Sequence, residues 1–258
     1  MGYCINCWRV TLIKIDLHIH SALSACADDE MSPSFILTEA LEKGLNLISI
    51  TDHNTISHSV LACSISNKKG IKVIPGVEVT SREEVHLLAF FDDTSALVEL
   101  GNLIEKLLPN VENKPDFFGY QVIYDQDGEI VDLDKRLRQA AVNMSLDKLV
   151  DEIHRLEGIA IPAHIDKNKF SLISQLGFLD KEAAFDAVEV SKYKWNKNNY
   201  KLGDTLSGFP VICGSDSHHP DDIGLFYMKS DVDKLLDYQF FKKYLTERKN
   251  ENHRRPLI

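Results

Sequence analysis

The chain has 258 residues, a formal net charge of -10 at pH 7 and a hydrophobic fraction of 44%. This composition is typical of a globular protein, and the length suits one large α/β domain or two small ones. Because nucleic-acid grooves depend on clustered lysine and arginine, the acidic balance argues against a broad nucleic-acid footprint. It permits a small anionic substrate bound through metal ions.

Five cysteines are scattered along the chain, at positions 4, 7, 26, 63 and 213. An odd and scattered set predicts free thiols in a reducing compartment. Cys4 and Cys7 form a CxxC pair without a second pair at zinc-finger spacing, and the other three are expected to be small buried residues or bystanders. No apolar run approaches the roughly 20 residues of a membrane span, and no signal-peptide pattern opens the sequence. We therefore expect a cytoplasmic protein without a membrane segment.

Strands and helices alternate along most of the chain. In order, we expect strands near 13–20, 45–51, 71–79, 85–91, 159–165, 187–190 and 210–214. Helices are expected at about 33–43, 57–68, 94–108 and 145–156. Short buried strands that alternate with helices favour a parallel sheet or barrel, whose sites lie at the C-terminal ends of the strands.

Residues 111–142 interrupt this alternation. Two short β-prone runs, 121–124 and 129–131, flank Asp127 and Gly128, which is a hairpin turn signal. We therefore expect an inserted segment or lid here rather than a separate domain.

Histidines and carboxylates gather where the expected strands end. The first strand places Asp16, His18 and His20 on one face, because alternate strand residues point the same way. The later strands and their loops supply Asp52, His53, Glu78, His86, His164, Asp216, His218 and His219. Glu78 lies among valines in a strand expected to be buried, where an unpaired carboxylate is costly and a bridged metal pair would remove the cost. Imidazole and carboxylate together suit zinc, manganese or iron, so the sequence predicts two or three clustered divalent ions.

Five motifs occur in a fixed order: DLHIHS at 16–21, ITDHNT at 50–55, PGVEVT at 75–80, PAH at 162–164 and GSDSHH at 214–219. With these motifs the chain resembles the PHP (polymerase and histidinol phosphatase) superfamily of metal-dependent phosphoesterases. The resemblance implies one domain over 1–258, with a distorted (β/α)7 TIM-like barrel at about 13–225 and a C-terminal helical tail at 226–258.

The resemblance also implies three overlapping sets of metal ligands. The first ion would be held by His18, His20, Glu78 and Asp216. The second would share Glu78 and add His86 and His164. The third would use His53, His218 and an acidic residue from the loop after the first strand.

The acidic ligand of the third ion is the least defined part of this set. Similar subfamilies have a short Ser-Asp-Gly loop, whereas this chain has the longer SACADDEMSP. We choose Asp28 over Asp29 because Asp28 lies five positions before Pro33, the position of the aspartate in the subfamilies that this chain resembles. A two-metal enzyme with a weak third site is the alternative, and Asp16 is expected to orient a ligand histidine.

Phosphate ester hydrolysis needs an in-line nucleophile and neutralisation of the phosphate charge. Two ions bridged by Glu78 would hold a hydroxide for this purpose. Catalytic roles are expected for His53, Asp216 and His219. Phosphate contacts are expected from Arg82, Lys192 and His219. The leaving-group acid could be His53, His219 or a metal-bound water, and the sequence does not choose.

The expected activity is that of a phosphatase or phosphodiesterase acting on a small phosphorylated metabolite or nucleotide. The alternative is a nuclease that trims short RNA or DNA ends with the same metals. The segment WNKNNYK at 195–201 could stack on and clamp a base, although a solvated helix is the simpler interpretation. A third hypothesis, an accessory barrel that binds metal without catalysis, conflicts with the full set of ligands. Neither a protein partner nor a membrane is indicated.

Overall fold

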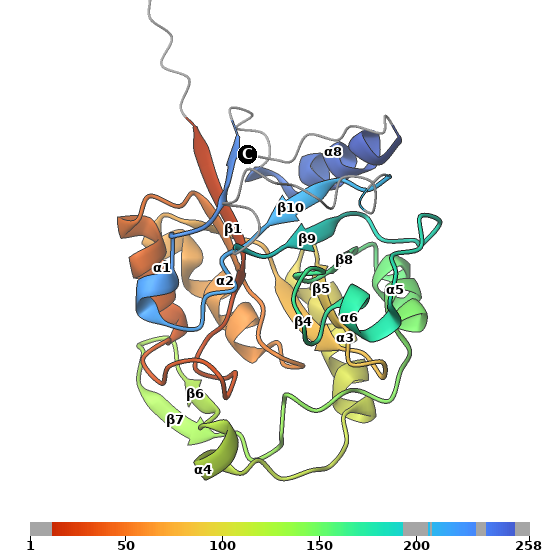
Figure 1. Ribbon diagram of the computed structural model, residues 1–258. Helices are drawn as coiled ribbons and strands as arrows, with labels where there is room; N and C mark the ends of the chain where they lie inside the picture. The colour runs from red at the N-terminus through yellow and green to blue at the C-terminus, as the bar shows by residue number, and fades with distance from the viewer. Residues whose placement is uncertain (1–11, 193–205, 207, 231–235, 251–258) are drawn as a thin grey trace, which may run out of the picture.

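The computed structural model describes residues 12–192, 206, 208–230 and 236–250 (Figure 1). The CxxC pair at Cys4 and Cys7 and the segment 195–201 lie outside the described residues. The strands are β1 (Ile13–Ile19), β2 (Leu47–Ile50), β3 (Lys72–Val73), β4 (Gly76–Thr80), β5 (His86–Phe90), β6 (Val122–Tyr124), β7 (Ile130–Leu133), β8 (Ile159–Pro162), β9 (Val188–Val190), β10 (Val211–Cys213) and β11 (Met228–Ser230). The helices are α1 (Pro33–Glu42), α2 (Ser57–Lys69), α3 (Thr94–Leu107), α4 (Pro115–Phe118), α5 (Leu146–Arg155), α6 (Leu172–Leu176) and α8 (Tyr238–Asn250), and a 3-10 turn covers Pro220–Asp222.

The strands pair in four sheets, with the orders β11-β1-β2-β3, β10-β9, β4-β5-β8 and β6-β7. The pairs β1–β2, β2–β3 and β9–β10 are parallel. The expectation of parallel strands is wrong for β5, which runs antiparallel to both β4 and β8. The strand expected over 71–79 is two strands, β3 and β4, which belong to different sheets. Pro75 lies between them and has no N–H with which to continue the hydrogen bonds of β3.

Single backbone bridges connect the separate sheets at their ends. His53 bridges Glu78, which joins the end of β2 to β4. Ile19 bridges Ser217, which joins β1 to the loop after β10. The paired strands that the structure describes do not form one continuous closed sheet, so the observed fold is a mixed α/β arrangement whose sheets meet at these bridges.

The elements outside this centre agree in part with the sequence prediction. The hairpin β6–β7 forms in the insertion, with Gly128 at φ 85 in its turn. Figure 1 shows this hairpin and α4 at the bottom of the view and α8 at the top. The tail is not wholly helical, because β11 pairs antiparallel with β1. Helix α8 packs Phe241 and Leu245, both fully buried, into the core around β1. Of the helices described, none has the length and apolar character needed to cross a bilayer.

Candidate metal centre

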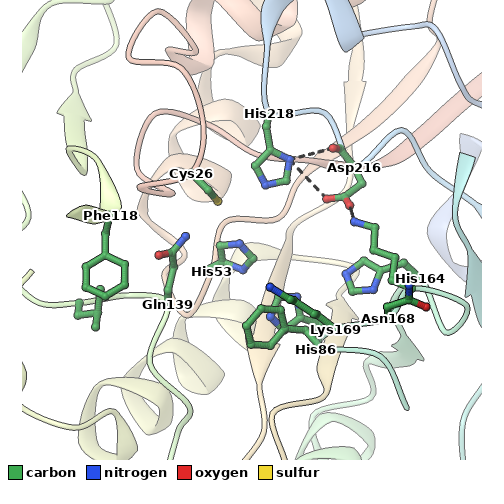
Figure 2. A pocket seen from close by; sticks show the side chains of 13 residues that line it. Cys26, His53, His86, Phe118, Gln139, His164, Asn168, Lys169, Asp216 and His218 are labelled. Atoms are coloured by element: carbon green, nitrogen blue, oxygen red, sulfur yellow. Dashed lines mark hydrogen bonds and ion pairs between the residues drawn. The ribbon is translucent and has the colours of Figure 1, made fainter. Parts of the chain in front are cut away.

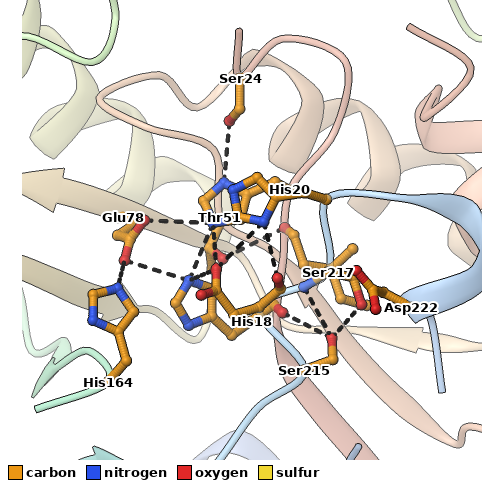
Figure 3. Close-up of polar contacts among 12 residues, drawn as sticks. His18, His20, Ser24, Thr51, Glu78, His164, Ser215, Ser217 and Asp222 are labelled. Carbon is orange, nitrogen blue, oxygen red and sulfur yellow. Dashed lines mark hydrogen bonds and ion pairs between the residues drawn. The ribbon is translucent and has the colours of Figure 1, made fainter. Parts of the chain in front are cut away.

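Five histidines surround the carboxylate of Glu78, which is fully buried (Figure 3). The nearest ring nitrogens belong to His53, 2.9 Å from Oε2, and His86, 3.1 Å from Oε1. The Nε2 atoms of His18, His20 and His164 each lie 3.4 Å from a Glu78 oxygen. The residues expected to share a bridging carboxylate therefore do surround one.

The direction of β5 explains how His86 reaches this point. His86 begins its strand, whereas His18 and Glu78 lie within β1 and β4 and the other ligand candidates follow the ends of their strands. Because β5 is antiparallel, its first residue pairs with Thr80 at the end of β4, and the next residue pairs with Pro162 at the end of β8. The start of β5 thus lies at the same edge as the ends of β4 and β8.

Asp216 supplies a second carboxylate to the centre. Its Oδ1 lies 3.4 Å from His18 Nε2 and 3.3 Å from His20 Nε2. Its Oδ2 contacts the ammonium of Lys167, a residue that the sequence analysis did not single out. Asp216 has φ 50 and His164 has φ 29, an uncommon backbone conformation that is typical of functional sites.

Hydrogen bonds away from the centre fix the proton positions on two of the histidines. Glu189 Oε2 accepts from His18 Nδ1 at 2.9 Å. Ser24 donates its hydroxyl to Asp52 at 2.7 Å, so it must accept from His20 Nδ1, 3.1 Å away. Both Nε2 atoms, 3.1 Å apart, then present lone pairs to the space beside Glu78. Two lone pairs at this distance repel each other unless a cation lies between them and the carboxylates.

Several buried polar atoms of the centre make no hydrogen bond. They are both carboxylate oxygens of Glu78 and the Nδ1 atoms of His53, His86 and His164. The Nδ1 atoms of His53 and His86 lie 2.9 and 3.1 Å from Glu78 oxygens, but not in hydrogen-bonding geometry. Burying such an atom without a hydrogen bond costs about 1–3 kcal/mol. Three groups of ligand atoms, each within 4.8 Å of one another, could hold an ion: His20, His53 and His218; His18, His20 and Glu78; and His53, Glu78 and His86. The residues present therefore fit a cluster of divalent ions.

The electrostatics of the two carboxylates agree with this interpretation. Burial opposes ionisation of Glu78, but the imidazoles of His86, His18 and His53 outweigh it and hold its pKa well below the usual range. Burial likewise opposes ionisation of Asp216, and His18 with other imidazoles outweighs it, so its pKa is also lowered. Both side chains can serve as anionic ligands at neutral pH.

One expectation about a supporting residue needs correction. Asp16 is fully buried, but its Oδ1 accepts from the backbone N–H of Ser215 and of His18, so it orients the chain and not an imidazole. Burial raises its pKa to about 7. The carboxylate that orients His18 is Glu189, which the sequence analysis missed. A signal was present, because Glu189 lies between two valines in a buried strand, as Glu78 does.

The structure does not bring four other candidates into the cluster. Asp28 pairs with His219 at 2.9 Å, and their side chains are 48% and 60% exposed. Arg82 donates to the side chain of Asn143 at 3.0 Å on the surface. Lys192 pairs with Asp222 at 3.0 Å.

A cavity of about 620 Å³ opens beside the cluster (Figure 2). One side is formed by His53, His86, His164, Asp216 and His218. The insertion provides Phe118, Leu137 and Gln139, and the loop after β8 provides Lys167, Asn168, Lys169 and Phe170. The ring of Phe170 stacks on His86 with centroids 4.8 Å apart. The insertion therefore forms one wall of the pocket at which the expected ligands lie.

Cys26 also lines this cavity and is not the bystander that the sequence analysis expected. Figure 2 shows its sulfur directed toward the imidazoles of His53 and His218. The residue is exposed, and partial desolvation alone would raise the pKa of its thiol, but the imidazoles of His53 and His218 lower it to about 6.

Comparisons with known proteins identify a family to which this chain is similar. The PHP domain family model matches residues 16–246. The 5′-3′ exoribonuclease of Haemophilus influenzae is 30% identical over 131 residues, which are 45% of this chain and 47% of that protein. A PolC-type DNA polymerase III of Caldanaerobacter subterraneus is 25% identical over 222 residues, which are 76% of this chain and 16% of that protein.

Among solved structures, a lesion-specific endonuclease from Pyrococcus furiosus superposes with a TM-score of 0.62 at 19% identity, over 92% of this chain and 56% of that one. This chain spans about half or less of the length of these relatives. The family match nevertheless covers most of the described residues and all five motifs. The chain therefore belongs to the PHP domain family.

Proposed function

We propose that this chain hydrolyses phosphate esters at the metal centre around Glu78. The observation that carries the proposal is a buried carboxylate among five imidazoles, both of whose oxygens make no hydrogen bond. The residues that would hold the ions are His18, His20, Glu78, His86, His164, Asp216, His53 and His218. Bound divalent ions would neutralise phosphate charge and activate water.

The protein's own part in the reaction is to bind and orient the phosphate and to limit water around it. Lys167 is the cation best placed for this, because its ammonium contacts Asp216 at the border between cluster and cavity. Burial lowers its pKa, but the carboxylate of Asp216 outweighs it, so the pKa is raised and the lysine stays charged. This role replaces the ones expected for Arg82 and Lys192, whose side chains bond elsewhere.

The cavity supports a nucleotide or a short oligonucleotide as the substrate. Phe118 and Phe170 line it, and flat aromatic rings stack on nucleobases. The 5′-3′ exoribonuclease among the similar proteins favours end trimming of nucleic acid. The lesion-specific endonuclease favours a nucleic-acid substrate without favouring its ends, and a related endonuclease Q structure holds a DNA duplex with an abasic lesion. A phosphatase for a small phosphorylated metabolite is the second candidate, because 620 Å³ accommodates a single small molecule.

A substrate panel tests the proposal. Purified protein would be assayed for phosphate release from phosphomonoesters and nucleoside bisphosphates, and for shortening of 5′-labelled RNA and DNA, with bound metals measured by elemental analysis. We expect turnover that is lost in His20→Ala and Asp216→Ala and kept in His154→Ala, a histidine in α5 outside the cluster. Activity on oligonucleotides alone would select the nuclease. Bound metal without turnover of any substrate would contradict the proposal.

The closed barrel and the cellular location expected from the sequence belong to the same proposal. The bridges that join β2 to β4 and β1 to the loop after β10 support a distorted seven-stranded (β/α) barrel. The free thiols of Cys26, Cys63 and Cys213 support a cytoplasmic location.

A further inference from the structure

One of the three ligand groups differs from the other two in charge. His18, His20 and Glu78 include a carboxylate, as do His53, Glu78 and His86. The group of His20, His53 and His218 consists of imidazoles alone. Three neutral imidazoles leave the charge of a divalent ion unbalanced, so an anionic protein ligand would strengthen the binding of a third ion in this group.

Asp28 is not placed to be that ligand. Its carboxylate is half-exposed and lies 2.9 Å from Nδ1 of His219. The loop after β1 turns twice before it reaches Asp28, with hydrogen bonds from Ser24 N to Ser21 O and from Ala27 N to Ser24 O. Asp28 N then bonds to His218 O, which attaches the loop to the other side of the site.

This loop conformation brings Cys26 to the site instead. Cys26 lines the cavity together with His53 and His218. Its sulfur is directed toward both imidazoles (Figure 2). His53 is 5% exposed, and it belongs with His20 and His218 to a group whose ring nitrogens lie within 4.8 Å of one another.

We propose that the thiolate of Cys26 binds a divalent cation together with His53 and His218, and that this position selects zinc. A thiolate is a soft ligand that favours zinc, whereas manganese and magnesium prefer carboxylate and other oxygen ligands. One cysteine and two histidines are three protein ligands, which is the number found in catalytic zinc sites. The inference rests on the proposed metal centre but assigns it a ligand and a metal preference of its own.

Cobalt serves as the probe because Co²⁺ replaces zinc and its thiolate complexes absorb in the near ultraviolet by charge transfer. Full-length protein would carry Cys4→Ser and Cys7→Ser, because a CxxC pair is itself a thiolate ligand set. After removal of metal by chelation, cobalt would be titrated into this background and into the same background with Cys26→Ser. Cys63→Ser is the matched control, since Cys63 lies in α2 and does not line the cavity.

We expect the charge-transfer band in the background and in Cys63→Ser, and its loss in Cys26→Ser. Elemental analysis after zinc loading should show one ion fewer per chain in Cys26→Ser and no change in Asp28→Asn. Zinc affinity at this position should fall by more than the roughly 10–100-fold that the loss of an outer-shell partner costs. Manganese should not protect Cys26 from alkylation by iodoacetamide, whereas zinc should.

Two results would overturn the inference. Stoichiometric cobalt binding without the band would show that no thiolate is a ligand, and loss of one ion in Asp28→Asn but not in Cys26→Ser would restore the acidic ligand. Neither measurement depends on turnover. A protein that hydrolyses phosphate esters without the band would refute the thiolate ligand and leave the proposed function in place.

Discussion

Replacing Glu189 by glutamine tests whether this buried carboxylate holds a ligand in position. Glu189 is 2% exposed and accepts two hydrogen bonds, from His18 Nδ1 at 2.9 Å and from the backbone N–H of His164 at 3.0 Å. Glutamine keeps the shape but has only one acceptor oxygen, and its NH₂ group faces one of the two donors. Even with the amide oxygen in the Oε2 position, the NH₂ group takes the Oε1 position, 3.1 Å from His18 Nδ1, and the imidazole loses the negative charge that fixes its proton on Nδ1.

The expected effect is a loss of metal affinity. Removal of an outer-shell partner of a ligand histidine typically costs about 10–100-fold in affinity, or about 1.4–2.7 kcal/mol. The upper part of this range applies here, because Glu189 also fixes the backbone of His164, a second ligand candidate. Zinc affinity would be measured by competition with a chromophoric chelator, and the fold of the metal-free protein by circular dichroism.

Asp186→Asn is a matched control for this experiment. Asp186 accepts from His154 Nε2 at 2.9 Å and from the backbone N–H of Ala160 at 2.7 Å, the same pair of donor types. His154 belongs to none of the ligand groups, so zinc affinity should not change. The reasoning is refuted if folded Glu189→Gln keeps its affinity, or if Asp186→Asn loses as much.

Three further predictions follow from the site. A Cβ on Gly214 would lie 2.6 Å from Cβ of His18, so Gly214→Ala should displace that ligand, and retention of the full metal content by elemental analysis would contradict this. Free zinc at 100 times its Kd should raise the free energy of unfolding by about 2.7 kcal/mol, measured by thermal denaturation, and Glu78→Gln should lose this gain. Burial lowers the pKa of His58, whose Nε2 accepts from Tyr124 N at 3.0 Å, so the native state binds fewer protons than the unfolded chain. Docking of the hairpin should therefore be complete above the ordinary imidazole pKa of 6.5 and weaken as the pH falls below it. The measurement is the amide-exchange protection of Tyr124, which should decrease over the same pH range. Constant protection down to about pH 5 would refute this prediction.

Most of the elements could be predicted because turn residues and apolar periodicity are local signals. Strand direction could not be read from periodicity, and β5 was expected to be parallel. A signal was available in the spacing, since the strands expected at 71–79 and 85–91 are too close for a parallel crossover of a dozen or more residues. The distance between two strands thus carries the direction that their composition does not.

The residues of the site likewise divide into those that local sequence signals predict and those that depend on the path of a loop. Alternation within β1 brought His18 and His20 together, and strand ends brought in most of the other ligands. Glu189 could have been found by the argument that found Glu78. Cys26 could not, because its position depends on the turns of a loop. Counting back from Pro33 to Asp28 assumed that the loop kept its path, whereas the extra residues form those turns and leave Asp28 at the surface.

The carboxylate of Asp52 sets the direction of hydrogen bonding on two sides of the molecule. It accepts the hydroxyl protons of Ser24 and of Ser21, so each serine accepts in turn from an imidazole Nδ1, that of His20 and that of His58. Each ring then presents a lone pair on its far nitrogen, one to the expected metals and the other to the backbone of the hairpin. An amide in place of Asp52 would leave every ligand unchanged, but its NH₂ group would donate to one of the two serines, which would then have to donate to its imidazole. The proton positions on His20 in the metal centre and on His58 beside the hairpin therefore both depend on the carboxylate of Asp52.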